Sequence, residues 1–397
     1  MKIAYQYRLR STKSQSAQME TWLNLLRRQY NYRLWERFDW WDSNRCPVNA
    51  CPLVCSIAPP SEQPEYFGQK RDLVLSKAKY PEYGDIHSAV LQDCIARVKK
   101  TFERFIKGDS KGIRSGRPRF KSSSRYRSFT YPAMKADCIL NKFITLPKIG
   151  KVKLILHRPI PEGFVIKTCT VIHLPDGWYV TLSLQDDMVP TISPDINAEK
   201  IVGIDVGLKE FLVTSEGESV PIPQFARKSE KRRKVLNKAL SRKRNKGTSR
   251  RQKAGKKLSK HYQKVVRQRR DFHFKVASQL LSKYDAIAHE ALNIKGLAKT
   301  RLSKSILDAG WGEFISILTN KAASAGLLTI PVNPSGTTQN CSGCGAKVPK
   351  TLKDRWHSCS CGMELDRDLN AALNVKQRAE GHPVFKAQRL LCNSRIG

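Results

Sequence analysis

The sequence is short of acidic residues. Its 397 residues contain 34 Asp or Glu against 72 Lys or Arg, which gives a formal net charge of +38. Solubility alone does not need so large an excess, and its sign is the one expected for a protein that binds a polyphosphate chain. The deficit of acids therefore makes nucleic acid the expected partner.

Two kinds of hydrophobic segment are also missing. The sequence has no run of about 18 apolar residues, so we expect no membrane-spanning helix and no membrane partner. Its first residues, MKIAYQYRLR, lack the apolar core of a secretory signal peptide. We therefore expect an intracellular protein, and 40% hydrophobic residues are enough for the cores of two or three domains.

The eleven cysteines lack the spacing of a disulfide framework in a chain of this length. Four of them crowd into one short segment, and two close pairs of thiolates suit a tetrahedral zinc ion: Cys341, Cys344, Cys359 and Cys361. The second pair has one residue between its cysteines instead of two, so His357 is an alternative ligand. Because four ligands leave no open position, we expect the zinc to be structural. The other cysteines are expected to be buried free thiols.

Hydrophobic periodicity divides the chain. Apolar residues recur every four residues from Trp22 to Phe38 and from Ile86 to Phe102, which predicts two helices. Residues 3–9 and the segment from about residue 126 alternate instead, and an Asp176-Gly177 turn predicts a hairpin. We therefore predict a small β-barrel that includes the N-terminal strand, followed by a boundary near residue 195.

The second half alternates strands with helices. We predict strands near residues 200–220, 284–292 and 327–332, one helix over 303–326 and another that begins near residue 368. From Arg227 to Arg270 there are twenty-one Lys or Arg residues and one acid, Glu230. A solvated helix face usually mixes charges of both signs, so this segment predicts two basic helices that bind phosphates.

Three separated acidic sites stand out in this basic chain. Asp205 ends the strand VGID, Glu290 ends the strand AIAHE, and Asp366 and Asp368 open the last helix. Taken singly, each has an ordinary structural explanation as a turn residue, a strand-end acid or a helix cap.

Together these acids have a joint explanation. They offer the hard oxygen ligands with which two Mg²⁺ ions hydrolyse a phosphodiester, and without metal they would repel one another. Asp366 and Asp368 are two residues apart and cannot point the same way on a helix, so only one is expected to be a ligand.

Several longer motifs occur in order along the chain: GIDVGLKEF, HEALNIKGL, SILDAGWGEF, NPSGTTQNCSGCG and CGMELDRDLNAALN. In combination they closely resemble the TnpB family of transposon-encoded, RNA-guided nucleases, which are relatives of the type V CRISPR effectors. The resemblance covers nearly the whole chain.

The resemblance implies a multi-domain α+β fold. Residues 1–12 and 125–195 would form a wedge-like β-barrel, interrupted by a helical recognition domain at 13–124. Residues 199–336 and 362–376 would form an RNase H-like (RuvC) α/β nuclease domain, with a zinc ribbon inserted at 337–361. Residues 377–397 are expected to be a weakly ordered C-terminal tail.

The resemblance also assigns roles. The family's catalytic, magnesium-binding acids correspond to Asp205, Glu290 and Asp368, with Asp366 as the fallback for the last. Two Mg²⁺ ions and one structural Zn²⁺ are the implied cofactors. The implied partners are a guide RNA derived from the transposon end and a double-stranded target DNA, cut beside a short flanking motif. The implied location is a prokaryotic cytoplasm, with association to the nucleoid when bound to DNA.

Two other functions fit parts of the pattern. An acid triad on an RNase H fold also serves a transposase that joins DNA ends. A zinc-ribbon protein with inert acids would be a non-catalytic, nucleic-acid-binding regulator.

Overall fold

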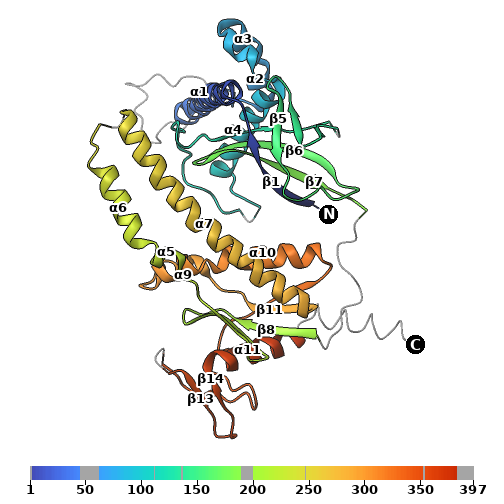
Figure 1. The fold of residues 1–397 in the computed structure, drawn as a ribbon, viewed down its shortest axis with the longest axis vertical. Coiled ribbons are helices and arrows are strands. Elements are labelled where there is room, and N and C mark those ends of the chain that lie inside the picture. The colour runs from blue at the N-terminus through green and yellow to red at the C-terminus, as the bar shows by residue number, and fades with distance from the viewer. Residues whose placement is uncertain are drawn as a thin grey trace. The chain divides into compact units, whose positions relative to one another are not determined.

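The computed structural model describes residues 2–44, 62–110, 112–135, 137–188, 200–245, 247–351 and 354–381. The chain forms two compact units, Met1–Asp187 and Met188–Gly397 (Figure 1). Among the cysteines predicted to be buried free thiols, Cys94, Cys138 and Cys169 are buried and free. Cys46, Cys51, Cys55 and Cys392 lie outside the described residues. Of the tail predicted at 377–397, residues 377–380 instead form the end of a helix (Arg367–Glu380), so the prediction is wrong there, and the part from residue 382 lies outside the described residues.

The first unit contains a seven-stranded antiparallel sheet in which β1 (Lys2–Arg10) lies between β7 and β5. The strand order is β2-β6-β7-β1-β5-β4-β3. The predicted hairpin is present, with Asp176-Gly177 between β6 and β7. The other strands are β2 (Ser128–Tyr131), β3 (Ile139–Leu140), β4 (Phe143–Leu146), β5 (Gly150–Ile155), β6 (Val165–Leu174) and β7 (Gly177–Gln185).

This sheet is open. Within the described residues β2 and β3 are its two edges, so the strands do not close into the predicted barrel. Arg97 covers the β2 edge, because its Nη1 donates to the Ser128 carbonyl oxygen at 2.9 Å. An open and a closed sheet share the same alternation of apolar residues, which is why the pattern did not distinguish them.

The two helices predicted in this half of the chain pack against this sheet. Helix α1 (Lys13–Asn44) contacts it through Trp22, whose ring centroid lies 5.5 Å from that of Phe129. Helix α4 (Ser88–Ile106) contacts α1 through Phe102 and Phe38, 5.9 Å apart between centroids. The apolar stripes of both helices thus share one core with the sheet.

Three short helical elements between α1 and α4 were not predicted: α2 (Tyr66–Arg71), α3 (Leu73–Lys79) and the 3-10 helix η1 (Pro81–Asp85). Two buried arginines of α1 hold α2 and the residue between α2 and α3. Arg33 Nη1 lies 3.1 Å from Asp72, and Arg37 Nε donates to Gln69 at 3.0 Å. Polar contacts of this kind leave no hydrophobic periodicity, so no sequence pattern indicated these short helices.

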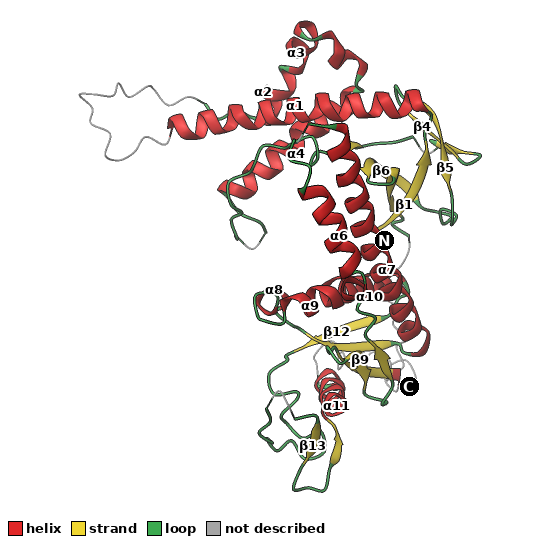
Figure 2. Ribbon diagram, turned by 60° about the vertical axis from the view of Figure 1, so that its left-hand side comes forward, coloured by secondary structure: helices red, strands yellow, loops and turns green. Residues whose placement is uncertain are grey.

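The second unit contains a five-stranded sheet with the order β10-β9-β8-β11-β12. Strands β8, β11 and β12 are parallel, so their carboxyl ends meet at one edge. The strands are β8 (Ile201–Asp205), β9 (Glu210–Thr214), β10 (Ser219–Pro221), β11 (Ala286–Glu290) and β12 (Leu328–Val332). Figures 1 and 2 show α7 (Ser249–Lys283) and α10 (Trp311–Ser324) on one face and α11 (Arg367–Glu380) on the other.

The remaining elements of this unit are short except for α6. They are α5 (Phe225–Lys228), α6 (Glu230–Ser241), α8 (Ile294–Leu297), α9 (Ser303–Ala309), β13 (Trp356–Ser358) and β14 (Glu364–Asp366). The two predicted basic helices are α6 and α7, and α7 continues beyond the basic segment. None of the helices among the described residues is apolar over a length that would cross a membrane.

The helix predicted over 303–326 is broken in two. Gly310 has a left-handed backbone with φ of +70°, which ends α9 before α10 begins. His273 of α7 reaches this break, where its Nε2 lies 2.9 Å from the Ala309 carbonyl oxygen. The apolar pattern runs through both helices, so only the glycine signalled the break.

Helix α11 lies directly on β8 at Gly203. A Cβ atom built at Gly203 would be 2.2 Å from the Ala372 carbonyl oxygen and 2.5 Å from the Lys376 nitrogen. Both neighbours are backbone atoms of the helix and cannot rotate away. A glycine at this position therefore sets how closely α11 approaches the sheet.

We expect Gly203→Ala to destabilise the second unit by at least about 2 kcal/mol, because the added methyl group overpacks the contact between strand and helix. Urea unfolding measures the change. Gly255→Ala is a matched control in α7, where a Cβ would only touch Leu240 at 3.9 Å. It should stabilise the unit by about 0.5 to 1 kcal/mol. Equal stabilities for the two variants would contradict the close packing.

Candidate functional site

Three predicted acids come together at the carboxyl edge of the second sheet. Asp205 ends β8, Glu290 ends β11, and Asp368 lies in the first turn of α11. Burial, and after it the neighbouring charges of Glu290 and Asp368, raise the pKa of Asp205 to about 8. A Cβ at Gly207 would lie 3.9 Å from Asp368 Oδ2, so the turn after β8 also reaches this acid.

Thr337 holds the second acid. Its hydroxyl oxygen lies 2.5 Å from Glu290 Oε1, and the threonine is buried. Burial raises the pKa of Glu290, while Thr337 and then Arg378 act in the opposite direction. No sequence pattern indicated this role of Thr337, because its partner lies 47 positions away in the chain.

The two acids that open α11 have different surroundings. Asp366 is the N-cap, and its Oδ1 accepts a hydrogen bond from the Asp368 amide at 2.8 Å. Asp368 is buried and approaches Asp205 closely enough to raise its pKa. Arg367 Nη2 lies 3.1 Å from Asp368 Oδ1 and offsets part of its charge. Asp366 thus has a capping contact, and Asp368 is the acid that lies close to Asp205.

The donor set of these acids fits hard divalent cations, which prefer carboxylate oxygens. With a pKa of about 8, the Asp205 carboxyl group keeps a proton at neutral pH, and a cation would displace it. The three carboxylates are spread more widely than the four cysteines. In the described part of the chain, only the cysteines form a group of three or more His, Cys, Asp or Glu with every ligand atom within 4.8 Å.

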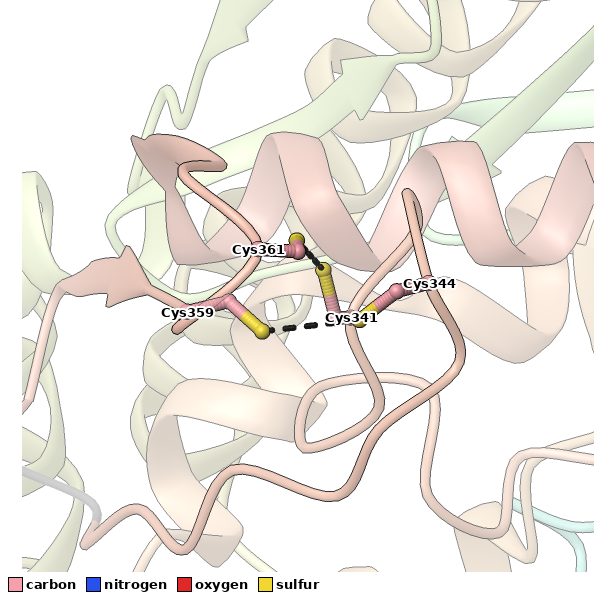
Figure 3. A group of neighbouring side chains, drawn as sticks. All are labelled: Cys341, Cys344, Cys359 and Cys361. Atoms are coloured by element: carbon pink, nitrogen blue, oxygen red, sulfur yellow. Dashed lines mark hydrogen bonds between the residues drawn. The ribbon is translucent and has the colours of Figure 1, made fainter.

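The four predicted cysteines form that compact group (Figure 3). Cys341 and Cys361 have their sulfur atoms 3.6 Å apart, and those of Cys344 and Cys359 are 3.5 Å apart. A tetrahedron with zinc to sulfur bonds of about 2.3 Å has sulfur atoms about 3.8 Å apart. The donor set therefore fits a zinc ion. The alternative ligand His357 is not a member of this group.

The pKa values of the thiols differ widely within the group. The Cys361 amide is the main cause that lowers the pKa of Cys359 to about 6. Burial raises the pKa of Cys341, but hydrogen bonds from the Cys344 amide and from His357 lower it to about 7. At Cys361 the Met363 amide favours the thiolate, yet the three other cysteines outweigh it and raise the pKa to about 12. Four thiolates without a cation would therefore be unstable.

Side-chain amides join α11 to the segment that leads into the cysteine group. Asn370 Oδ1 accepts from the Ser342 amide at 3.0 Å, and Asn374 Nδ2 donates to the Thr337 carbonyl at 2.9 Å. Both asparagines are buried. Asparagine is a poor helix former, so two asparagines four residues apart in an Ala-rich helix are a sequence pattern that indicates polar contacts on one face. This role was not predicted.

The basic segment lies on α5, α6 and the first part of α7. Helix α6 has no buried residue, so its cations face solvent. The single acid of the segment, Glu230, pairs with Arg233 at 3.3 Å and with Lys304 at 2.6 Å. The two helices therefore present a cationic surface whose charge is largely uncompensated within the segment, as suits a polyanion.

Three family models match the chain. Residues 1–46 match a helix-turn-helix domain, residues 183–301 match a probable transposase, and residues 311–375 match a Cas12f1-like TNB domain. In the structure the first of these segments contains one strand and one long helix, β1 and α1.

Two similar proteins span most of the chain. A putative RNA-guided DNA endonuclease of Streptomyces pristinaespiralis is 29% identical, over 94% of this chain and 89% of that protein. The putative RNA-guided DNA endonuclease InsQ of Escherichia coli K12 is 27% identical, over 78% of this chain and 79% of that protein. TnpB-like proteins of Acanthamoeba polyphaga mimivirus are 32% identical over 49% of this chain and 42% of their own length.

One solved structure has a similar fold. The cryo-EM structure of a Cas12f1-sgRNA-target DNA complex contains a chain that matches with a TM-score of 0.56 and 16% identity. The match covers 92% of this chain and 83% of that chain. It agrees with the multi-domain α+β architecture described above.

We expect Cys341→Ser to reduce bound zinc from one ion per chain to almost none, because a hydroxyl replaces one of four thiolates. Metal analysis of the purified protein measures the loss. Hydrogen exchange should also rise at the start of α11, which Asn370 joins to Ser342. The control is Cys138→Ser in the first unit, which should keep its zinc. Full zinc in Cys341→Ser would exclude this residue as a ligand.

We expect Asp205→Asn to change how stability depends on pH in magnesium-free buffer. Because the pKa of Asp205 is raised from 3.8 to about 8 in the folded state, ionisation opposes folding, and stability is lost as pH rises through this interval. The asparagine cannot ionise, so this variant should gain melting temperature over the unaltered protein, little at pH 5 and most above pH 8. Thermal scans across this range measure the difference. The same offset at every pH would contradict the buried ionisation.

Proposed function

The chain belongs to the TnpB family of transposon-encoded proteins, and from this premise we propose that it is an RNA-guided, metal-dependent DNA endonuclease. Two relatives that span most of the chain are described as putative RNA-guided DNA endonucleases. The observation that carries the proposal is the convergence of Asp205, Glu290 and Asp368 at one sheet edge, with the pKa of Asp205 raised to about 8. A cluster of this kind costs stability and is hard to explain as a folding device.

Two Mg²⁺ ions are the proposed cofactors, with Asp205, Glu290 and Asp368 as the residues that would hold them. When bound, such ions activate a water molecule and stabilise the leaving oxygen of a phosphodiester. The protein's own contribution is positioning. Thr337 orients Glu290, the Asp366 cap fixes the first turn of α11, and the Gly203 contact sets the height of Asp368 over β8.

The domains follow the same proposal. The open sheet of the first unit would be the wedge domain (1–12 and 125–195), with α1 to α4 as the recognition domain (13–124). The sheet of the second unit would be the RuvC nuclease domain (199–336 and 362–376), and the cysteine group a structural zinc ribbon (337–361). The cationic surface of α6 and α7 would bind the backbone of the guide RNA or of its duplex with the target strand.

The partners of the proposed enzyme are a guide RNA from the transposon end and a double-stranded DNA target. Base pairing with the guide would choose the sequence, and the protein would read a short flanking motif. Expression of the chain with its flanking DNA, followed by sequencing of the RNA that copurifies, tests this directly. A homogeneous RNA that ends in a replaceable segment supports the proposal. Joining of transposon ends without RNA would support a transposase instead.

We expect the complex with a reprogrammed guide to cut matched double-stranded DNA in the presence of Mg²⁺, and Asp368→Asn to slow cleavage by at least about a hundredfold while RNA binding persists. Asp366→Asn is the matched control, because asparagine also caps helices, and it should cut within a few-fold of the unaltered protein. Single-turnover cleavage assays measure both. Cleavage by Asp368→Asn at the unaltered rate would remove this acid from the proposed site.

A further inference from the structure

A cavity of about 290 Å³ lies beside the acid cluster, at the carboxyl edge of β8 and β11. Its walls are mostly apolar and include Ile204, Val206, Glu290, Leu292, Trp311 and Ile315. Trp311 and Ile315 belong to α10, so the cavity lies on the face of the sheet that this helix covers. The motif SILDAGWGEF, which the proposed chemistry leaves without a role, thus supplies part of its wall.

The cavity shares Glu290 with the acid cluster. Successive residues of a strand point to opposite faces, so Asp205 and Ile204 lie on different faces of β8, as Glu290 and His289 do on β11. The cavity therefore lies on the opposite face of the sheet from Asp205, next to the edge at which β8 and β11 end. A nucleic acid strand with a phosphate at the acids would have its neighbouring nucleotide at this opening.

Trp311 brings an unused hydrogen-bond donor. Its side chain is 6% exposed, and its Nε1 is buried without a hydrogen-bond partner among the described residues. Such a group loses its hydrogen bonds to water without replacement, and most buried N–H groups in proteins have a partner. An acceptor on a ligand in the cavity would supply it.

His289 is a further polar residue of the cavity wall. Its Nδ1 lies 3.1 Å from the Glu290 carbonyl oxygen. A carbonyl oxygen only accepts hydrogen bonds, so Nδ1 carries a hydrogen and this contact holds the ring beside Glu290. The residues of the cavity wall thus combine apolar side chains with the indole of Trp311 and the imidazole of His289.

We propose that this cavity binds one unstacked nucleobase of the DNA strand next to the phosphodiester that is cut. The inference rests on the proposed function and extends it. A planar ring with acceptor and donor atoms on its edge matches these walls, and enzymes that hold unstacked bases use apolar and aromatic contacts of this kind. The volume is at the lower end of the range of about 300 to 1,000 Å³ for small-molecule pockets, which admits one ring system and excludes a helix or a duplex.

The test is cleavage of a double-stranded target in which each nucleotide around the cut is replaced in turn by an abasic residue. Ile315→Phe fills the cavity from α10, and Trp311→Phe keeps an aromatic ring but removes the N–H donor. Ser316→Phe is the matched control, because it adds the same side chain at an exposed position of the same helix. Thermal unfolding of each variant separates loss of the pocket from loss of the fold.

We expect one abasic position to slow cleavage by the unaltered protein about tenfold or more, which is the size expected for the loss of one stacked base. Ile315→Phe should slow cleavage of the intact target similarly, and the abasic residue should slow that variant no further, because both changes remove the same contact. Trp311→Phe should give a smaller loss, and Ser316→Phe should behave like the unaltered protein.

Two results would contradict the nucleobase pocket and leave the proposed nuclease function intact. In one, Ile315→Phe folds and cuts the intact target at the unaltered rate. In the other, abasic residues slow Ile315→Phe and the unaltered protein equally at every position. Absence of any guided cleavage by the unaltered protein would instead overturn the proposed function itself, and the nucleobase pocket with it.

Discussion

The close contact between α11 and β8 is the constraint on which the candidate site depends. Gly203 lets the helix backbone approach the strand directly, and the first turn of that helix carries Asp368. A larger residue would lift the helix and move this acid away from Asp205. Gly203, which has no side chain, therefore sets the distance between Asp205 and Asp368.

The acid cluster and the cysteine group share one electrostatic property, since both bring groups that ionise to negative charge close together. Burial and the neighbouring acids hinder ionisation at Asp205, and the three other cysteines hinder it at Cys361, as the raised pKa values of both groups show. A cation resolves both problems, but different donor atoms select different ions, hard oxygens for one site and thiolates for the other. In a chain with a net charge of +38, the acid cluster and the cysteine group thus concentrate negative charge at places where a cation would compensate it.

Periodicity predicted most of the long elements, because burial of one face leaves a regular apolar pattern. It also located the acids, since each ends a predicted strand or opens a predicted helix. The open edge of the first sheet, the break at Gly310 and the helices held by Arg33 and Arg37 depend on contacts between distant residues, so no local pattern revealed them. The different surroundings of Asp366 and Asp368 became visible only in the cap geometry, and the choice of Asp368 as the ligand stays a prediction. The catalytic roles and the domain boundaries remain predictions of the family resemblance.

The asparagine contacts of α11 have a consequence for how the segment that carries the four cysteines can change. Asn370 and Asn374 form hydrogen bonds with the backbone of residues 337 to 342, where the cysteine segment begins. At its other end, β14 is followed directly by α11, the helix that carries both asparagines. Both ends of the cysteine segment are thus attached to the same helix. The loop between them can lengthen, shorten or change its surface residues without moving Asp368 in the first turn of that helix, so its sequence is free to vary.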